Sequence, residues 1–200
     1  MFKKKNFSLI VLTGLLLFIS QTGYAQSRML SKGATAPLFN AKASLDGKAF
    51  NFSLKDALKK GPVVVYFYPS AYTGGCDLEA HTFATLKDKF TAAGASIIGV
   101  SADNIERLND FSADPDYCAG KFPVASDAKG KIAASYGLNI SSVQSGITDV
   151  RGVKINHGFI PRTTYVINKN RKIIAVFSSG KDKISPDQHV TKSLAIVQKL

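Results

Sequence analysis

The segment over residues 63–76 constrains the fold of this chain more than any other. Residues 63–68 (VVVYFY) are β-branched or aromatic at every position, which is typical of a strand covered on both faces of a sheet. A turn follows, and apolar residues then recur at helical spacing: Leu78, Phe83, Leu86 and Phe90. The segment therefore predicts a buried strand, a turn, and a helix that begins near Cys76.

The predicted position of Cys76 at the start of a helix affects its chemistry. At the start of a helix a side chain lies among unpaired backbone N–H groups and at the positive end of the helix dipole, which favours a thiolate over a thiol. The thiolate is the nucleophilic form of cysteine. Cys76 is therefore a candidate nucleophile, and the alternative is a small buried apolar residue.

The N-terminus has the pattern of a secretory signal peptide. Three lysines at positions 3–5 precede a short apolar stretch over residues 9–19, and the small residue Ala25 precedes Gln26. The apolar stretch is shorter than the roughly 20 residues that span a bilayer. We predict that residues 1–25 are cleaved, that the protein is periplasmic or secreted, and that it forms no stable association with a membrane.

Residues 26–200 have the length of one domain with its own core. The formal net charge of the whole chain is +12, and loss of the three leader lysines lowers it to +9. The remaining basic residues are scattered, and no basic helix or basic–aromatic pattern stands out. We interpret this charge as favouring solubility and expect no nucleic-acid partner.

The alternation of elements along the chain indicates an α/β domain. A hairpin is predicted around Asp46 and Gly47, and further strands over residues 96–101, 122–127, 163–168 and 172–177. Helices are predicted over residues 53–60, 104–111 and 129–136, and from Ser185 to the C-terminus. The sequence therefore predicts a three-layer α/β domain with a mixed sheet, in which residues 139–158 form a long surface loop or a small β excursion.

Only two cysteines occur, Cys76 and Cys118. In an exported protein they could form one structural disulfide, or a disulfide that forms and breaks during turnover. Their spacing does not distinguish the two.

Pro69, Thr73 and Cys76 form a P-x-x-x-T-x-x-C motif that resembles the active-site signature of the peroxiredoxins, the alkyl hydroperoxide reductase / thiol-specific antioxidant family. Residues 66–69 and 76–80 are most similar to the bacterioferritin-comigratory (Q-type) branch. Residues 122–127, 131–137 and 161–167 resemble later blocks of the family in the same order. The similarity covers roughly residues 33–198, with residues 139–158 as an insertion, and implies a thioredoxin-like α/β/α fold.

The resemblance implies a thiol-dependent peroxidase that reduces hydrogen peroxide and organic hydroperoxides through a sulfenic acid on Cys76. Arg162 matches the family's arginine, which would stabilise the thiolate and the departing oxygen. Thr73 would direct a hydroxyl towards the sulfur or the peroxide, and Pro69 would shield the pocket. Outside this context Thr73 would be a helix N-cap, Pro69 the end of a strand, and Arg162 a surface charge.

Many Q-type relatives have a second cysteine five residues after the first, where this chain has His81. The resemblance instead suggests Cys118 as the resolving cysteine, which would form a disulfide with Cys76 after local unwinding. The alternative is that an external thiol resolves Cys76. A thioredoxin-like reductant is the implied partner; no cofactor and no metal are expected, and the relatives suggest a monomer.

Thr73 occupies the position at which thioredoxin-fold reductases have the first cysteine of C-x-x-C, so dithiol exchange at this turn is excluded. Two alternatives to the peroxidase remain. One is a non-catalytic thioredoxin-fold redox sensor, and the other is an exported thiol–disulfide oxidoreductase that uses Cys76 and Cys118.

Overall fold

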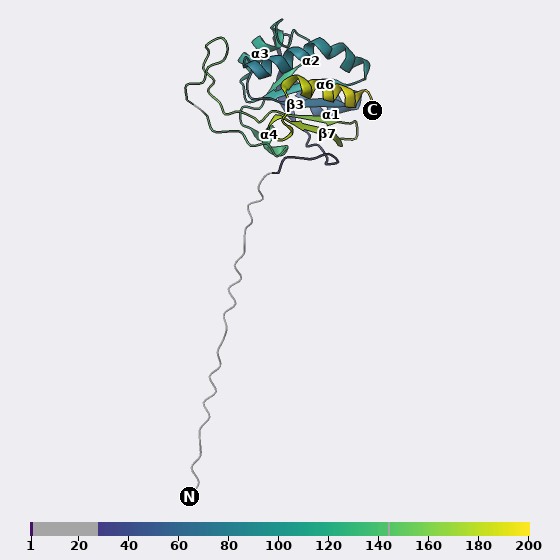
Figure 1. Cartoon of the computed structure of the whole chain (residues 1–200), viewed down its shortest axis with the longest axis vertical. Coiled ribbons are helices and arrows are strands. Elements are labelled where there is room, and N and C mark those ends of the chain that lie inside the picture. The colour runs from purple at the N-terminus through teal and green to yellow at the C-terminus, as the bar shows by residue number, and fades with distance from the viewer. Residues whose placement is uncertain (2–27, 144) are drawn as a thin grey trace.

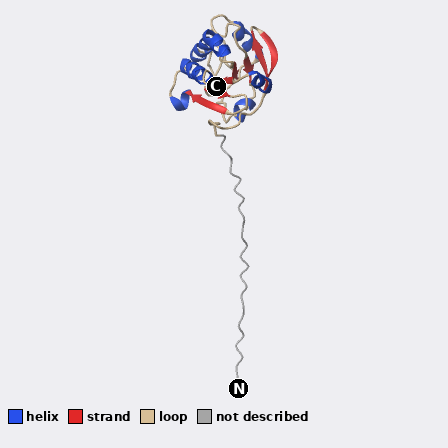
Figure 2. Cartoon of the chain, turned by 90° about the vertical axis from the view of Figure 1, so that its right-hand side faces the viewer, coloured by secondary structure: helices blue, strands red, loops and turns tan. Residues whose placement is uncertain are grey.

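The computed structural model describes Met1, residues 28–143 and residues 145–200. The predicted leader over residues 1–25 therefore lies outside the described residues, apart from Met1. In the described part, helices flank a single mixed sheet on both faces (Figures 1 and 2). The predicted three-layer α/β architecture is confirmed.

The sheet has seven strands in the order β2-β1-β5-β4-β3-β6-β7. The strands are β1 (Asn40–Leu45), β2 (Lys48–Ser53), β3 (Val63–Phe67), β4 (Ser96–Ser101), β5 (Val124–Ser126), β6 (Thr163–Ile167) and β7 (Ile173–Ser178). β3 is an interior strand that pairs with β4 in parallel and with β6 in antiparallel orientation, so the sheet is mixed.

The interior strand β3 shows how the three layers arise. All five of its residues are buried, as the sequence predicts. Because side chains alternate along a strand, Val64 and Tyr66 enter the core on one face of the sheet. Val63, Val65 and Phe67 enter the core on the other face. Two hydrophobic cores, one on each face, hold the sheet between its helices.

The helices are α1 (Leu54–Lys60), α2 (Gly74–Ala92), α3 (Ile105–Ala113), α4 (Lys131–Ser135), α5 (Ser179–Asp182) and α6 (Pro186–Val197). Figure 1 shows α2, α3 and α6 on one side of the sheet and α1 and α4 on the other. The short helix α5 is not predicted by the sequence. Among the helices of residues 28–143 and 145–200, none combines the length and apolar character needed to cross a bilayer.

Helix starts follow the predicted capping residues. Ser53 caps α1 by accepting a hydrogen bond from the backbone N–H of Asp56. α6 begins at Pro186, after Ser185, which forms a capping box with Gln188. The hairpin at Asp46 and Gly47 is also present, since β1 and β2 pair directly on either side of it.

One expectation needs correction. α2 begins at Gly74, near Cys76 as predicted, but Leu78 is 47% exposed although it belongs to the predicted apolar stripe. The inward face of the first turns is occupied instead by Cys76, Glu79 and Ala80. The described residues of the 139–158 segment form no helix or strand, in agreement with the predicted long loop, and the only β-bridge among them joins Thr148 and Lys154.

Candidate active site

Cys76 is the third residue of α2 and lies almost completely buried, at 2% exposure. Thr73 is the N-cap residue with extended backbone, and its carbonyl accepts the Cys76 N–H at 2.7 Å. The sulfur therefore lies within the first turn, where helix N–H groups carry partial positive charge. The predicted strand–turn–helix presentation of Cys76 is thus present.

The loop between β3 and α2 is fixed by a buried carboxylate two residues after the end of β4. Asp103 accepts hydrogen bonds from the Ser70 hydroxyl and the Ala71 N–H, both at 2.8 Å. The next residue, Tyr72, has a left-handed backbone with φ of +58°. Such a conformation is strained for a residue with a large side chain and persists only when its surroundings hold it. The hydrogen bonds to Asp103 therefore hold the loop before α2 in one conformation.

Arg162 reaches Cys76 through strand pairing. Phe67 at the end of β3 lies opposite Thr163 at the start of β6, so Arg162 extends beyond the sheet beside the loop. Its Nη2 donates to the Cys76 Sγ at 3.1 Å. Gly75 leaves room for this contact, because a Cβ there would lie only 3.1 Å from the same Nη2. The predicted juxtaposition of Arg162 and Cys76 is present.

Glu79 is the main site residue that the sequence reasoning missed. It is fully buried one turn after Cys76 and pairs with Nη1 of Arg162. Burial raises the pKa of Glu79 to about 7, although Arg162 opposes the rise. Its spacing of three residues from Cys76, which places both side chains on one helix face, was the available signal.

His189 on α6 lies behind this ion pair. Oε1 of Glu79 has no hydrogen-bond partner among the described residues and lies 4.0 Å from Nδ1 of His189. The ring nitrogens of His189 are hydrogen-bonded to Thr164 and Ser179, both at 2.9 Å. Burial, together with Arg162, lowers the pKa of His189 to about 4, so the ring is neutral at pH 7.

The net effect on the Cys76 thiol differs from the sequence expectation. Burial raises the pKa of Cys76, and Arg162 and the Ser70 backbone lower it without cancelling the rise. Glu79 adds to the rise because its negative charge disfavours a second one nearby. The expectation of a thiol already shifted towards the thiolate is therefore wrong for this closed conformation. Desolvation of the buried sulfur raises the pKa of Cys76 by more than Arg162 and the hydrogen bonds lower it.

Thr73 and Pro69 precede Cys76 in the loop that leads into α2. The Thr73 hydroxyl contributes to lowering the pKa of Cys76, but its proton is donated to the Ser70 carbonyl at 2.8 Å. Pro69 is half-buried directly after Tyr68, where the chain leaves the sheet. Neither residue shows a further contact with the sulfur that would fix its role.

Comparison with known proteins identifies the family. The sequence pattern of the AhpC/TSA family matches residues 32–176. The chain belongs to the AhpC/TSA family. It is 35% identical over 141 residues to a Mycobacterium tuberculosis protein named as a peroxiredoxin, covering 70% of this chain and 80% of the relative. It is 31% identical over 172 residues to the chloroplastic peroxiredoxin Q of Oryza sativa subsp. japonica, covering 86% and 68%.

Solved structures agree with this membership. Peroxidoxin BcpB from Mycobacterium tuberculosis superposes with a TM-score of 0.69 at 32% identity, over 86% of this chain and 98% of that one. Xanthomonas campestris peroxiredoxin Q superposes with a TM-score of 0.62 at 25% identity, over 86% and 96%. The chain is thus a peroxiredoxin of the bacterioferritin-comigratory (Q-type) branch with a thioredoxin-like fold, and a thiol-dependent peroxidase. The redox-sensor and thiol–disulfide oxidoreductase alternatives are not favoured.

The second cysteine of this peroxiredoxin lies in the loop after α3. Cys118 is completely buried in the same hydrophobic core as Cys76, and both are free thiols. His81, at the position where many relatives have a second cysteine, is an exposed residue of α2. Its Nδ1 lies 3.0 Å from the carbonyl oxygen of Asp116, so the Cys118 loop rests against α2.

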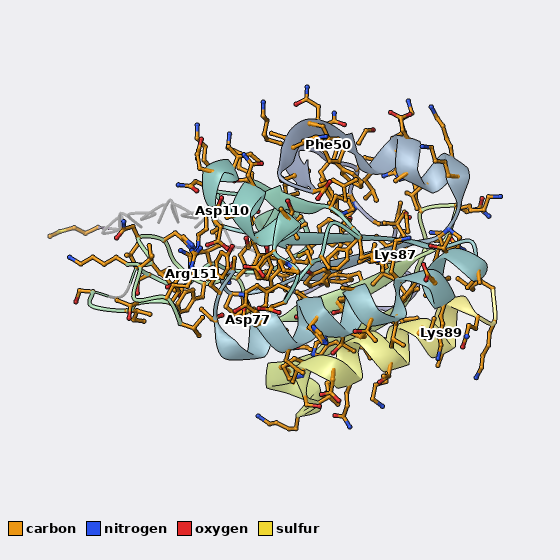
Figure 3. All side chains as sticks on the ribbon, turned by 90° about the horizontal axis from the view of Figure 1, so that it is seen from above. Phe50, Asp77, Lys87, Lys89, Asp110 and Arg151 are labelled. Carbon is orange, nitrogen blue, oxygen red and sulfur yellow. The ribbon has the colours of Figure 1, made fainter. Side chains whose placement is uncertain are left out.

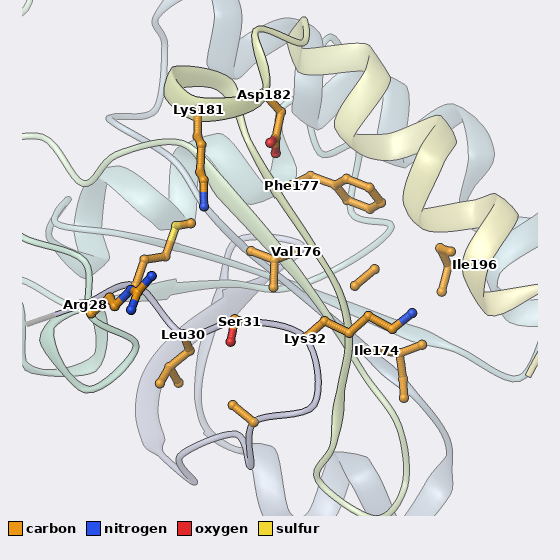
Figure 4. A pocket seen from close by; sticks show the side chains of 13 residues that line it. Arg28, Leu30, Ser31, Lys32, Ile174, Val176, Phe177, Lys181, Asp182 and Ile196 are labelled. Carbon is orange, nitrogen blue, oxygen red and sulfur yellow. The ribbon is translucent and has the colours of Figure 1, made fainter.

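A groove of about 720 Å³ lies away from this chemistry, beside β7 (Figure 4). Apolar and basic side chains line it, among them Leu30, Val176, Phe177, Ile196, Lys32 and Lys181. Neither cysteine lines the groove, so its position gives no reason to connect it with the sulfur chemistry of the enzyme. Within the described residues no group of three metal-ligating side chains gathers.

Proposed function

We propose that Cys76 is the residue of this peroxidase that attacks the peroxide and that Arg162 activates it. The observation that carries the proposal is the 3.1 Å contact between Arg162 Nη2 and the Cys76 sulfur at the start of α2. A guanidinium stays charged at any physiological pH, so it favours the thiolate over the thiol in an otherwise desolvated pocket.

In the first step the Cys76 thiolate attacks one oxygen of the peroxide. A sulfur–oxygen bond forms, the O–O bond breaks, and the departing oxygen takes up a proton to leave as water or an alcohol. The sulfur is oxidised by two electrons to a sulfenic acid and the peroxide is reduced by the same two electrons. Arg162 and the N–H groups of the α2 start stabilise the negative charge on the departing oxygen.

Glu79, Pro69 and Thr73 support this step. The buried ion pair with Glu79 fixes the direction of the Arg162 guanidinium, so that one NH2 group faces the sulfur. Pro69 shields the approach to the sulfur without offering a competing N–H. Thr73 donates to a peroxide oxygen once substrate replaces its present contact with Ser70.

In the second step Cys118 resolves the sulfenic acid. The Cys118 sulfur attacks the Cys76 sulfur, a disulfide forms, and the hydroxyl of the sulfenic acid leaves with a proton as water. Because both sulfurs are buried and unbonded in the closed structure, the loop that carries Cys118 and the first turn of α2 must open. A thioredoxin-like dithiol then reduces the exposed disulfide and restores both thiols.

Cysteine variants test this assignment. Wild type should consume hydrogen peroxide with dithiothreitol, and Cys76→Ser should lose that activity by about a thousand-fold or more, because the nucleophile is gone. Cys118→Ser should form the sulfenic acid at an unchanged rate. After one equivalent of peroxide, mass spectrometry should find a Cys76–Cys118 cross-link in wild type and a persistent sulfenic acid in Cys118→Ser. A persistent sulfenic acid in wild type would overturn the role of Cys118 alone, whereas an active Cys76→Ser would overturn the role of Cys76.

The export of the enzyme and its monomeric state belong to the same proposal. We infer cleavage after Ala25 and a periplasmic or secreted location from the basic, then apolar, N-terminus. N-terminal sequencing of protein from the periplasmic fraction should begin at Gln26, and light scattering should give the mass of one chain. A mature protein that begins at Met1 would contradict the export assignment.

A further inference from the structure

Part of the 139–158 segment, which the peroxidase chemistry does not use, lies against the loop that presents Cys76 through Val150 and Arg151. The backbone N–H of Val150 donates to the Tyr72 carbonyl at 3.0 Å. The guanidinium of Arg151 lies 3.3 Å from the centroid of the Tyr72 ring. Arginine at this distance over an aromatic face is an attractive contact. Figure 3 shows Arg151 at the same end of the molecule as Asp77, which lies in the first turn of α2.

A buried carboxylate fixes the direction of Arg151. Asp149 accepts from the Arg151 side chain at 3.1 and 3.2 Å, and from the Arg151 backbone N–H at 2.8 Å. The same carboxylate pairs with Arg107 of α3 at 2.8 Å. Arg107 in turn donates to the Ala71 carbonyl at 2.8 Å and pairs with Asp103 at 3.0 Å. The segment is thus tied to the loop before α2 by a connected set of charged contacts.

The Tyr72 ring also joins the two cysteine-bearing parts of the chain. Its centroid lies 5.1 Å from that of Phe111 and 5.3 Å from that of Tyr117, and both contacts are edge-on. Tyr117 directly precedes Cys118, and Tyr72 lies four residues before Cys76. A movement that frees either cysteine segment must therefore separate this ring from its neighbours.

We propose that Asp149 and Arg151 form a clasp on Tyr72 and act as positioning residues that set how often the Cys76 and Cys118 segments open. Asp149 holds Arg151, Arg151 holds the Tyr72 ring, and the ring holds Tyr117 and the backbone before α2. The clasp slows the approach of Cys118 to an oxidised Cys76 and leaves the attack on peroxide unaffected. Its catalytic consequence rests on the proposed resolving role of Cys118.

The opening itself can be measured without peroxide. In a Cys76→Ser background Cys118 is the only thiol, and its alkylation by iodoacetamide requires the loop to open. Arg151→Ala should speed this alkylation about five-fold, the loss expected for one cation–aromatic contact and its ion pair. Lys154→Ala removes the same charge from an exposed position of the same segment and should leave the rate unchanged. Equal rates in Arg151→Ala and its parent would overturn the proposal.

Two further variants separate a clasp from a general loss of stability. Leu58→Ala removes a buried side chain on the opposite core, so it lowers the free energy of unfolding without touching the clasp. It should speed Cys118 alkylation less than Arg151→Ala does. Arg151→Lys keeps the charge facing Asp149 and should restore part of the slow rate. A larger effect from Leu58→Ala would show that global unfolding controls the labelling and would overturn the clasp.

A peroxide experiment in the two-cysteine protein then tests the catalytic consequence. After one equivalent of hydrogen peroxide, quenching and mass spectrometry should show the disulfide forming about five-fold faster in Arg151→Ala, with sulfenic acid formation unchanged. Faster labelling combined with no disulfide in wild type would support the clasp and overturn the role of Cys118. A disulfide that forms at the same rate in both proteins would overturn the clasp and leave the role of Cys118 intact.

Discussion

The two cysteines of this enzyme are nearly equally buried but have different charged neighbours. Cys76 lies at a helix start with Arg162 at 3.1 Å from its sulfur. Burial raises the pKa of Cys118 well above its ordinary value, and the carboxylates of Asp114 and Asp77 raise it further. At Cys76, by contrast, the guanidinium opposes the effect of burial. Burial raises the pKa of both thiols, and only Cys76 has a cation that opposes this rise, in keeping with its proposed role as the nucleophile.

Arg162→Lys should have the largest effect on this difference. A lysine ammonium lacks the planar donors with which Arg162 contacts the Cys76 sulfur and Glu79 together. The second-order rate constant with hydrogen peroxide should fall about a hundred-fold, the scale for losing one preorganised donor to a developing oxyanion. Stopped-flow kinetics measures the rate, and thiolate absorbance against pH should show a higher pKa for Cys76.

Arg171→Lys is the matched control, since Arg171 donates to the Ala36 carbonyl far from the two cysteines in sequence and joins no contact with them. It should leave the rate constant unchanged. A rate constant for Arg162→Lys within two-fold of wild type would show that the guanidinium does not distinguish Cys76 from Cys118.

Glu79→Gln should widen the difference in pKa between Cys76 and Cys118, whereas Arg162→Lys should narrow it. The negative charge of Glu79 raises the pKa of Cys76, so a neutral glutamine lowers it. The pH profile of the peroxide reaction should then move to lower pH. The plateau rate constant should fall by about ten-fold, because Arg162 loses a charged hydrogen bond that directs it. A profile that stays in place or moves to higher pH would contradict the assigned sign.

Asp114→Asn should have the smallest effect of these variants, and it should change the reactivity of Cys118. Asp114 is the largest charged contribution to the raised pKa of Cys118, so its neutral isostere lowers that pKa. In the Cys76→Ser background, alkylation of Cys118 at fixed pH should rise about two-fold, as expected for one partly screened charge. Asp88→Asn, an exposed acid of α2, serves as control and should change nothing. An unchanged rate in Asp114→Asn would mean that opening alone limits the reaction of Cys118.

Much of the fold could be predicted because its signals are local. The all-buried strand β3, the hairpin at Asp46 and Gly47, and the start of α6 each depend on residues adjacent in sequence. The four-residue helix α5 lacks such a signal. The pairing of Arg162 with Cys76 came from the family resemblance, because the two residues lie 86 positions apart.

The electrostatics of the site could not be predicted in the same way. The pKa of Cys76 depends on how completely the loop and the core exclude water, which is a tertiary property. His189 and Glu79 meet only because α6 packs against α2. The contact of Arg151 with the Tyr72 ring depends on the left-handed backbone of Tyr72 and on the buried carboxylate of Asp149. Hydrophobic periodicity in the sequence predicts neither feature.

The route by which Arg162 reaches the sulfur has a consequence for biosynthesis. Ribosomes add Cys76 to the growing polypeptide long before Arg162, and the two meet only after β6 has joined β3. Until then the nascent chain carries a cysteine with no guanidinium beside it. If Arg162 activates Cys76 as proposed, the reaction with peroxide therefore begins only after β6 has paired with β3.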